Sequence, residues 1–194
     1  MLDTHARKYV NPFIEKGANF FIKLKLTPNN VTTIALLLGI VSATLLYFNK
    51  SILAVIVLWI SGYLDAVDGA IARKTNSSSS FGTVLDITFD RIVEIGIIIV
   101  TGIKVVDVRF NLIILLSCIL ISMVIFLTVG AVSEKNGVKS FYYQAGVAER
   151  SEGFIMFSLM ILSNDYLGII INIFSLLIIV TAIQRINEAR KILK

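Results

Sequence analysis

Long apolar runs alternate with short polar segments along most of the chain. A hydrocarbon core about 30 Å thick requires roughly 20 helical residues to cross it. Six runs approach or reach this length, and they predict six transmembrane helices. They cover residues 30–48, 52–73, 82–103, 110–132, 150–163 and 166–184. The fifth is the shortest, because its uninterrupted apolar part extends only over residues 153–163.

Apolar positions before the first run are spaced as on one side of a helix. They are Val10, Phe13, Ile14, Ala18, Phe21 and Leu24. Lysines lie elsewhere on the helical wheel, whereas Phe20 and Ile22 blur the pattern. The pattern predicts an amphipathic helix that lies in the membrane interface within residues 1–27 and ends at the turn around Pro28. We interpret this helix as a structural anchor, with contact to a substrate as the alternative.

The composition agrees with an integral membrane protein. Hydrophobic residues make up 56% of the 194 residues, which is too apolar for an ordinary soluble domain. The chain is also too short for two large domains, and it contains no internal repeat. We therefore predict a single all-α domain over residues 1–194, with the interfacial helix in 1–27 and a six-helix transmembrane bundle in 28–194. The charged N-terminal segment does not resemble a secretory signal peptide.

The distribution of basic residues predicts the orientation in the membrane. If the N-terminus is cytoplasmic, most of the 18 lysines and arginines fall on the cytoplasmic side, and only Lys50, Lys104 and Arg109 fall outside. This asymmetry follows the positive-inside rule and predicts a multi-pass protein of the cell membrane with both termini in the cytoplasm. The net charge of +5 then faces anionic lipid, so no nucleic-acid partner is expected.

Four aspartates interrupt the second and third apolar runs, within the stretch DAVDGAIARKTNSSSSFGTVLDITFD at positions 65–90. Asp65 and Asp68 are three residues apart and share one face of a helix. Asp86 and Asp90 are four apart and share a face of the next helix. If the two helices are antiparallel neighbours, the four carboxylates meet at one level near the cytoplasmic face.

Four ionised carboxylates in a medium of low dielectric constant require compensation by protons, cations or metal ions. Arg73 and Arg91 would neutralise two of them at most. Oxygen ligands without a nearby histidine or cysteine suit magnesium or manganese, and two divalent ions would balance the four charges. Intramembrane aspartates also form proton relays and cation pathways, so a cation or proton transporter remains an alternative to an enzyme at this point.

Small residues surround the aspartates. Gly69, Ala72 and Gly82 keep side chains off the same surface and leave room for a bulky ligand. Arg73 presents a planar fork of donors that suits a phosphate group. Together with metal-binding carboxylates, these features indicate a diphosphate bridged by metal ions, which stabilise the attacking and leaving oxygens in phosphoryl transfer.

The stretch has the form D-x2-D-G-x2-A-R-x8-G-x3-D-x3-D. Its fixed positions are Asp65, Asp68, Gly69, Ala72, Arg73, Gly82, Asp86 and Asp90. This arrangement resembles the signature of the CDP-alcohol phosphotransferase family. The resemblance implies an enzyme of phospholipid biosynthesis that transfers the phosphatidyl group of a CDP-linked lipid, such as CDP-diacylglycerol, to a small alcohol acceptor and releases CMP by a two-metal mechanism. Family members are commonly homodimers, so a homodimer is also implied.

The resemblance also implies roles for individual residues. Asp65, Asp68 and Asp86 are implied to be metal ligands, and Asp90 both a ligand of a second metal ion and the general base. The positions implied to bind the CDP-lipid are Asn29, Asn30, Val31, Thr32, Gly69, Arg73, Ser79 and Gly82. Purely structural roles remain open for some of these positions, because Asn30 or Thr32 would also cap the first span and Ser79 the third.

Three further stretches, LDITFDR, GVAERSEG and AIQRINEAR, resemble the phosphatidylinositol phosphate synthase branch of the family. That resemblance implies that Arg150 and Arg185 bind the acceptor. The chain departs from the branch at two points: the fourth span contains no lysine, and Gly153 stands where a second arginine is expected. The acceptor pocket then either takes a different alcohol or uses Lys135 or Lys139 from the following loop. Alternatively, the two arginines extend to lipid headgroups at the ends of their helices.

Overall fold

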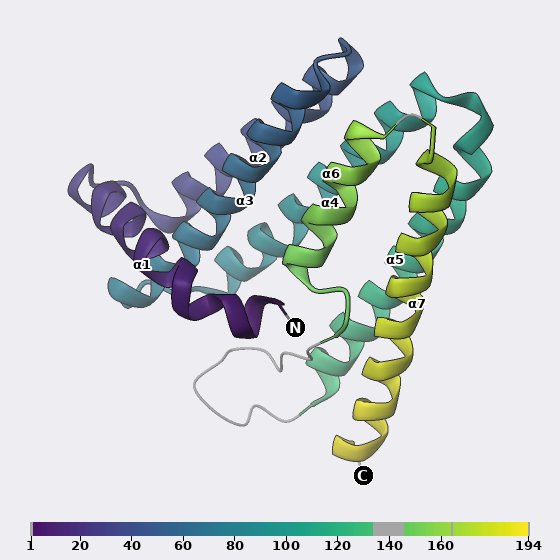
Figure 1. The fold of residues 1–194 in the computed structure, drawn as a ribbon. Coiled ribbons are helices and arrows are strands. Elements are labelled where there is room, and N and C mark those ends of the chain that lie inside the picture. The colour runs from purple at the N-terminus through teal and green to yellow at the C-terminus, as the bar shows by residue number, and fades with distance from the viewer. Residues whose placement is uncertain (1, 134–145, 164, 194) are drawn as a thin grey trace. The chain divides into compact units, whose positions relative to one another are not determined.

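The computed structural model describes residues 2–133, 146–163 and 165–193. Every regular element in this part of the chain is helical, with seven α-helices and one short 3-10 helix, which confirms the all-α class. The backbone divides into two compact units (Figure 1). We call His5–Val105 the N-terminal unit, and Val106–Lys194 with Met1–Thr4 the C-terminal unit.

Each unit contains consecutive helices. The N-terminal unit is built from α1 (Leu2–Lys23), α2 (Pro28–Tyr47), α3 (Ser51–Lys74) and α4 (Ser80–Lys104). The C-terminal unit is built from η1 (Val106–Val108), α5 (Arg109–Val132), α6 (Arg150–Leu162) and α7 (Leu167–Ile192). Each of the six predicted apolar runs corresponds to one helix, from α2 to α7.

Four of these helices are long and apolar enough to cross a membrane: α2, α3, Val106–Val132 and α7. The other two differ for separate reasons. Helix α4 is long enough but carries four charged residues between positions 86 and 94. Helix α6 has 13 residues and extends only about 20 Å at the α-helical rise, which is less than the hydrocarbon core. The described helices therefore support a multi-pass helical membrane protein with four candidate spans, and the count of six stays a prediction.

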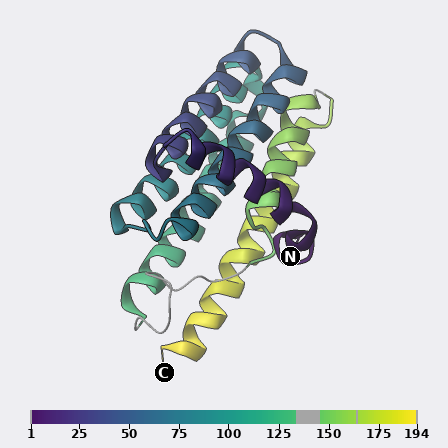
Figure 2. The ribbon, with the colours of Figure 1, turned by 90° about the vertical axis from the view of Figure 1, so that its left-hand side faces the viewer.

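Helix α1 is anchored on α3 along a narrow stripe. Ala18 is completely buried in an apolar cluster that includes Val67. Gly17 lies so close to the Tyr63 hydroxyl that any side chain at position 17 would collide with it. The same hydroxyl donates a hydrogen bond to the carbonyl oxygen of Phe13 at 2.9 Å. These contacts hold α1 obliquely to the pair formed by α2 and α3 (Figure 2).

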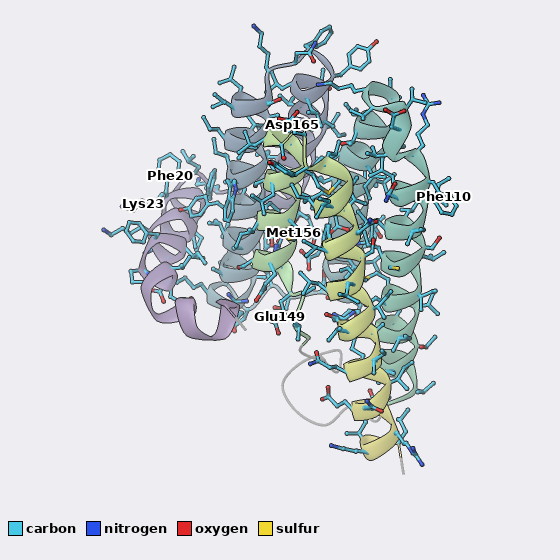
Figure 3. All side chains as sticks on the ribbon, turned by 45° about the vertical axis from the view of Figure 1, so that its right-hand side comes forward. Phe20, Lys23, Phe110, Glu149, Met156 and Asp165 are labelled. Carbon is cyan, nitrogen blue, oxygen red and sulfur yellow. The ribbon has the colours of Figure 1, made fainter. Side chains whose placement is uncertain are left out.

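The apolar side predicted for α1 is divided in the structure. Three of its members are packed in or against the apolar cluster: Ile14, Ala18 and Phe21. The other three are exposed: Val10, Phe13 and Leu24. Phe20 and Lys23 also point outward from the helix (Figure 3). The prediction of a helix is confirmed, but half of its apolar side does not pack against α3, because only the narrow stripe around Ala18 reaches that helix.

Helix α2 is the centre of the N-terminal unit, since it packs against both α3 and α4. Towards α3, the buried hydroxyls of Ser42 and Ser61 cross the helix interface. Ser42 donates to the Ala54 carbonyl and Ser61 to the Ala35 carbonyl, each at 2.7 Å. Small residues and interhelical hydrogen bonds of this kind allow close helix packing in a membrane.

Towards α4, glycine permits the close approach. A side chain at Gly39 would collide with Val93, so the Val93 side chain of α4 packs directly on the backbone of α2. In contrast, α3 and α4 make few close backbone contacts with each other. Their approach to each other is made by side chains, because one carboxylate oxygen from each of Asp65, Asp68 and Asp86 lies within 4.8 Å of the other two. Helix α2 packs against both α3 and α4.

In the C-terminal unit, α7 packs against both α5 and α6. Asn111 of α5 donates to Asn172 of α7 at 2.8 Å. Phe157 of α6 and Phe174 of α7 meet edge to face, with ring centroids 5.1 Å apart. Cys118 is a buried free cysteine on α5, where it packs as a small apolar residue.

Candidate functional site

Three of the four predicted aspartates form a carboxylate cluster. One carboxylate oxygen from each of Asp65, Asp68 and Asp86 lies within 4.8 Å of the other two. Asp65 and Asp68 on α3 are each only 6% exposed, and Asp86 on α4 is half-buried. The expected convergence of α3 and α4 carboxylates is therefore observed for these three residues.

The orientation of α3 about its own axis determines which way Asp65 and Asp68 face. On its apolar side, Leu64, Val67 and Ile71 are buried in the cluster shared with α1 and α2. Their burial leaves α3 little freedom to turn. Because Asp65 and Asp68 are three residues apart, both carboxylates can then reach Asp86 on α4. The buried apolar side of α3 thus orients the carboxylates on its other side.

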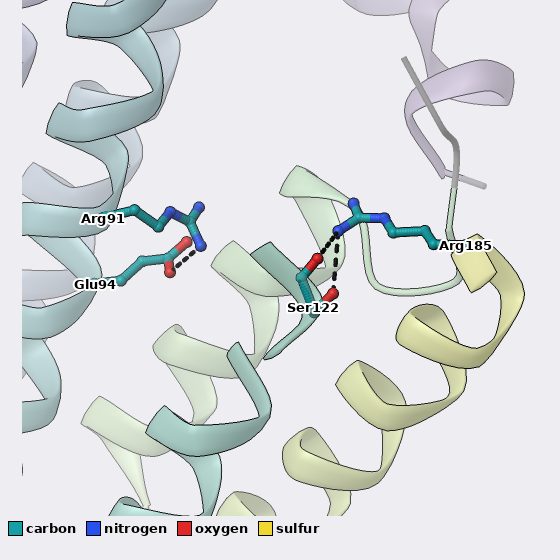
Figure 4. A network of polar contacts seen from close by, with 4 residues as sticks. All are labelled: Arg91, Glu94, Ser122 and Arg185. Carbon is teal, nitrogen blue, oxygen red and sulfur yellow. Dashed lines mark hydrogen bonds and ion pairs between the residues drawn. The ribbon is translucent and has the colours of Figure 1, made fainter. Parts of the chain in front are cut away.

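Asp90 lies one turn beyond Asp86 on α4 and is half-buried, but it does not belong to the close group of three. Further along the helix, Arg91 pairs with Glu94, with Nη1 and Oε2 at 2.6 Å (Figure 4). Glu94 was not singled out from the sequence. Its position four residues beyond Asp90 would have identified it, because residues with that spacing share a helix face.

Gly69 and Arg73 lie together at the end of α3. A Cβ atom at Gly69 would be 3.3 Å from Nη1 of Arg73, so the guanidinium group extends back over the glycine. Arg73 itself is exposed. The predicted bare surface at Gly69 is therefore lined by the arginine that the sequence assigns to a phosphate.

The beginnings of α2 and α4 also meet. A Cβ atom at Gly82 would lie 3.1 Å from the Ser79 hydroxyl and 3.2 Å from the side-chain oxygen of Asn29. Ser79 caps α4, since its hydroxyl accepts a hydrogen bond from the Gly82 amide at 3.0 Å. The structural role considered for Ser79 is thus observed, and three positions assigned to the CDP-lipid are gathered in one place.

The remaining positions of the TPNNVT segment have different surroundings. Thr27 caps α2 by accepting from the Asn30 amide at 3.3 Å, and Pro28 is the first residue of the helix. The alternative in which Asn30 or Thr32 caps this helix is wrong. Asn30 is exposed, Val31 is fully buried in the apolar cluster, and the Thr32 hydroxyl donates back to the Pro28 carbonyl at 3.0 Å.

Arg185 is buried within the C-terminal unit. Its Nη1 donates to the carbonyl oxygen of Ser122 at 3.2 Å and to the hydroxyl of the same residue at 3.0 Å (Figure 4). The guanidinium carbon lies 4.9 Å from the centre of the Phe126 ring, a favourable cation–π distance. The alternative in which Arg185 extends to lipid headgroups is therefore wrong, because its charged end is bound to α5.

Arg150 is the first residue of α6 and is half-buried, directly after Glu149 (Figure 3). A Cβ atom at Gly153, one turn later, would meet no atom within 4 Å. The position of the missing arginine is therefore open to a larger side chain. Lys135 and Lys139 lie outside the described residues.

The donor set of the carboxylate cluster fits a hard divalent cation. It consists of carboxylate oxygens from three residues within 4.8 Å, and the described chain brings no histidine or cysteine into the group. Three negative charges so close together in a largely buried place favour a cation among them. Oxygen ligands of this kind are those that magnesium and manganese prefer.

The helices and the carboxylate cluster together define an all-helical, multi-pass membrane protein with aspartates buried inside one helical unit. Residues 25–184 match the family model of CDP-alcohol phosphatidyltransferase, and the chain therefore belongs to this family. It is a membrane transferase of phospholipid biosynthesis. The family membership supports the enzyme and gives no support to the transporter alternative.

Named relatives agree with this assignment. The chain is 33% identical over 188 residues to the archaetidylinositol phosphate synthase of Pyrococcus horikoshii, and the match covers 95% of each chain. It is 35% identical over 95 residues to the phosphatidylinositol phosphate synthase of Corynebacterium glutamicum, a match covering 48% of this chain and 43% of that protein.

Two crystal structures of the Mycobacterium tuberculosis phosphatidylinositol phosphate synthase share the fold. One is in complex with manganese and citrate, and it matches with a TM-score of 0.73 over 91% of this chain and 88% of that chain. The other has CDP-DAG bound, and it matches with a TM-score of 0.70 over 91% of this chain and 92% of that chain. Both are 22% identical to this chain.

Proposed function

We propose that the protein transfers the phosphatidyl group of a CDP-linked lipid to the hydroxyl of a phosphorylated polyol, and that CMP is released. The observation that carries this proposal is the carboxylate cluster, formed by residues at the spacing of the family signature. An inositol phosphate is the first acceptor to test, because the names of two relatives refer to inositol phosphate products. CDP-diacylglycerol and a CDP-linked ether lipid are the two donors to compare.

The donor site would be formed by the ends of three helices in the N-terminal unit. Asn29, Ser79 and Gly82 are gathered where α2 and α4 begin, and Arg73 extends over Gly69 at the end of α3. An arginine over a bare backbone suits a diphosphate, because the guanidinium fork bonds two oxygens and the glycine leaves space for them. The proposed donor-binding set also includes the next three residues at the start of α2, which are Asn30, Val31 and Thr32.

Asp65, Asp68 and Asp86 would hold divalent metal, magnesium or manganese, and Asp90 would contribute to a second ion. When bound, the ions would offset the carboxylate charge and stabilise the charge that develops on the attacking and leaving oxygens. Asp90 would accept the proton of the acceptor hydroxyl. The oxygen then bonds to the phosphorus that carries the lipid, and the bond from this phosphorus to the bridging oxygen of CMP breaks. The half-buried position of Asp90, one turn from the cluster, suits a base that must reach a mobile substrate.

The acceptor would be bound by Arg150 and Arg185. Arg185 is held in place by Ser122 and Phe126, so little conformational freedom is lost when it binds an anion. Charge-assisted hydrogen bonds from arginine are suited to a phosphate group on the acceptor.

The proposed arrangement in the membrane follows from the basic residues and from α1. Both termini and the site would be cytoplasmic in a single-domain, multi-pass protein of the cell membrane. The exposed apolar residues of α1, among them Phe13, Phe20 and Leu24, would enter the lipid interface. We also propose a homodimer, as is common in the family.

The test is CMP release by the purified protein in detergent. Each CDP-lipid would be combined with magnesium or manganese and with serine, glycerol phosphate, inositol or inositol phosphate. We expect release with inositol phosphate, and none after the divalent ions are chelated. CMP release that persists without divalent ions would contradict the metal site. Release only with an uncharged alcohol would contradict the phosphorylated acceptor, and no release with any pair would contradict the proposed reaction.

A further inference from the structure

The loop that leads into α6 is bound to α7 through its backbone. Two successive amides of the loop donate to side chains of α7: Val147 to the Gln184 side-chain oxygen at 3.1 Å, and Ala148 to the Thr181 hydroxyl at 2.8 Å. The donors and acceptors are 37 and 33 positions apart in the sequence. The side chains of Gln184 and Thr181 therefore satisfy the backbone amides of Val147 and Ala148.

Shape complementarity adds to these hydrogen bonds. Gly146 is buried, and any side chain there would collide with the methyl group of Thr181. Thr181 is itself only 1% exposed, and its hydroxyl donates to the Leu177 carbonyl at 2.9 Å. Because its proton is used in that bond, an oxygen lone pair is directed at the Ala148 amide. The loop is thus held against α7 in one register.

This anchoring determines where Arg150 begins α6, two residues after Ala148. Thr181 and Gln184 are three residues apart on α7, and Arg185 follows directly. The same turn of α7 therefore carries one proposed acceptor-binding arginine and the two side chains that fix the loop leading to the other. Arg185 is bound to Ser122 of α5, so its own position is also fixed.

We propose that Thr181 and Gln184 are positioning residues for the acceptor: they hold the 146–148 loop so that Arg150 is oriented, together with Arg185, towards a phosphorylated alcohol. The proposal rests on the proposed function. Neither residue needs to touch the substrate. An arginine binds a phosphate tightly only when its fork is already oriented, because ordering a long side chain during binding costs affinity.

The experiment compares Thr181→Val, which keeps the shape but removes the hydroxyl, with Thr181→Ser, which keeps the hydroxyl. Initial rates of CMP release would be measured with inositol 1-phosphate as the probe and with CDP-diacylglycerol. Loss of the loop hydrogen bond is expected to raise the KM for inositol 1-phosphate about tenfold in Thr181→Val and at most about twofold in Thr181→Ser. The KM for the CDP-lipid and the kcat at saturating acceptor should change by less than about twofold, because the donor site lies in the other helical unit.

A second pair of variants distinguishes loss of the loop hydrogen bond from a general folding defect. Gln184→Leu removes the oxygen that accepts from Val147, whereas Gln184→Glu retains an acceptor at that position. The acceptor KM should rise for the leucine variant and stay near the wild-type value for the glutamate variant. An unchanged acceptor KM in both Thr181→Val and Gln184→Leu would overturn the proposal. So would a change in which kcat and the donor KM move as much as the acceptor KM, because that pattern indicates general loss of structure. If the wild-type protein releases no CMP with any acceptor, the proposed function itself fails.

Discussion

The two helical units position their candidate functional side chains in different ways. In the N-terminal unit, the carboxylate cluster comes from two successive helices, and its three aspartates lie within 22 positions, 65–86. In the C-terminal unit, Arg185 is bound to a residue 63 positions away, and the loop before Arg150 is bound to side chains 33 and 37 positions away. Helical periodicity aligns the first group, whereas contacts between distant segments align the second.

The difference has consequences for binding. The carboxylate cluster gathers like charges, so it favours a bound cation. The buried guanidinium group of Arg185 already has acceptors and an aromatic ring within the protein. We therefore expect changes in the N-terminal unit to abolish turnover, and changes in the C-terminal unit to alter the choice and affinity of the acceptor.

Replacement of the proposed base should have the largest effect. Asp90→Asn is expected to lower the rate of CMP release by about 10²- to 10⁴-fold, because general base catalysis contributes that much. Binding of the CDP-lipid, measured by equilibrium titration, should remain. The control is Asp107→Asn, which alters an exposed aspartate of the C-terminal unit. Retained turnover in Asp90→Asn would remove this residue as the base and weaken the contrast between the two units.

Loss of the buried arginine should have the next largest effect, and on a different parameter. Arg185→Leu is expected to raise the KM for inositol phosphate about 10- to 100-fold, since a hydrogen bond to a charged group contributes about 1.5–3 kcal/mol. Arg190→Leu, which removes an exposed arginine of the same helix, is the matched control. If both variants behave alike, or if only the donor KM changes, then Arg185 does not serve the acceptor.

A change in helix packing should affect stability before catalysis. In Gly39→Ala, the new methyl group would meet Val93 across the interface of α2 and α4. We expect the free energy of unfolding in detergent to fall by about 1–3 kcal/mol, as is typical of overpacking, and Val93→Ala to restore part of it. Gly168→Ala in the C-terminal unit should have little effect, because its Cβ would lie 3.8 Å from Val108. A stable Gly39→Ala variant would show that α2 and α4 can move apart.

The smallest expected effect is a gain of affinity. Gly153→Arg adds a guanidinium group where a side chain meets no atom within 4 Å of its Cβ. We expect the KM for inositol phosphate to fall by about fivefold, through one added charge-assisted hydrogen bond, and the KM for CDP-lipid to stay unchanged. Gly153→Gln is the uncharged control. An equal fall with both variants would indicate a change in helix stability, because glycine is a poor helix former.

The helices themselves could be predicted from local patterns. Apolar runs of about 20 residues and the positions of the polar breaks predicted α2 to α6 within two residues at each end, whereas α7 continues eight residues past its predicted end at 184, to Ile192. Four of the six predicted spans are long and apolar enough by themselves, and the count of six stays a prediction because α4 carries charges and α6 is short. The pairing of Asp65 with Asp68 follows from helix periodicity alone, and their approach to Asp86 follows from a short connection between two helices.

The class of the protein, its helices and the residues of its carboxylate site are encoded locally in the chain, because these depend on spacing within and between adjacent helices. Three features became visible only in the folded chain: α2 packs against both α3 and α4, half of the apolar side of α1 is exposed, and Arg185 is bound inward at Ser122. Folding also brought Thr181 and Gln184 to the loop before α6. These features depend on contacts between side chains that are far apart in the sequence. Hydrophobic periodicity reports local secondary structure and does not predict such contacts.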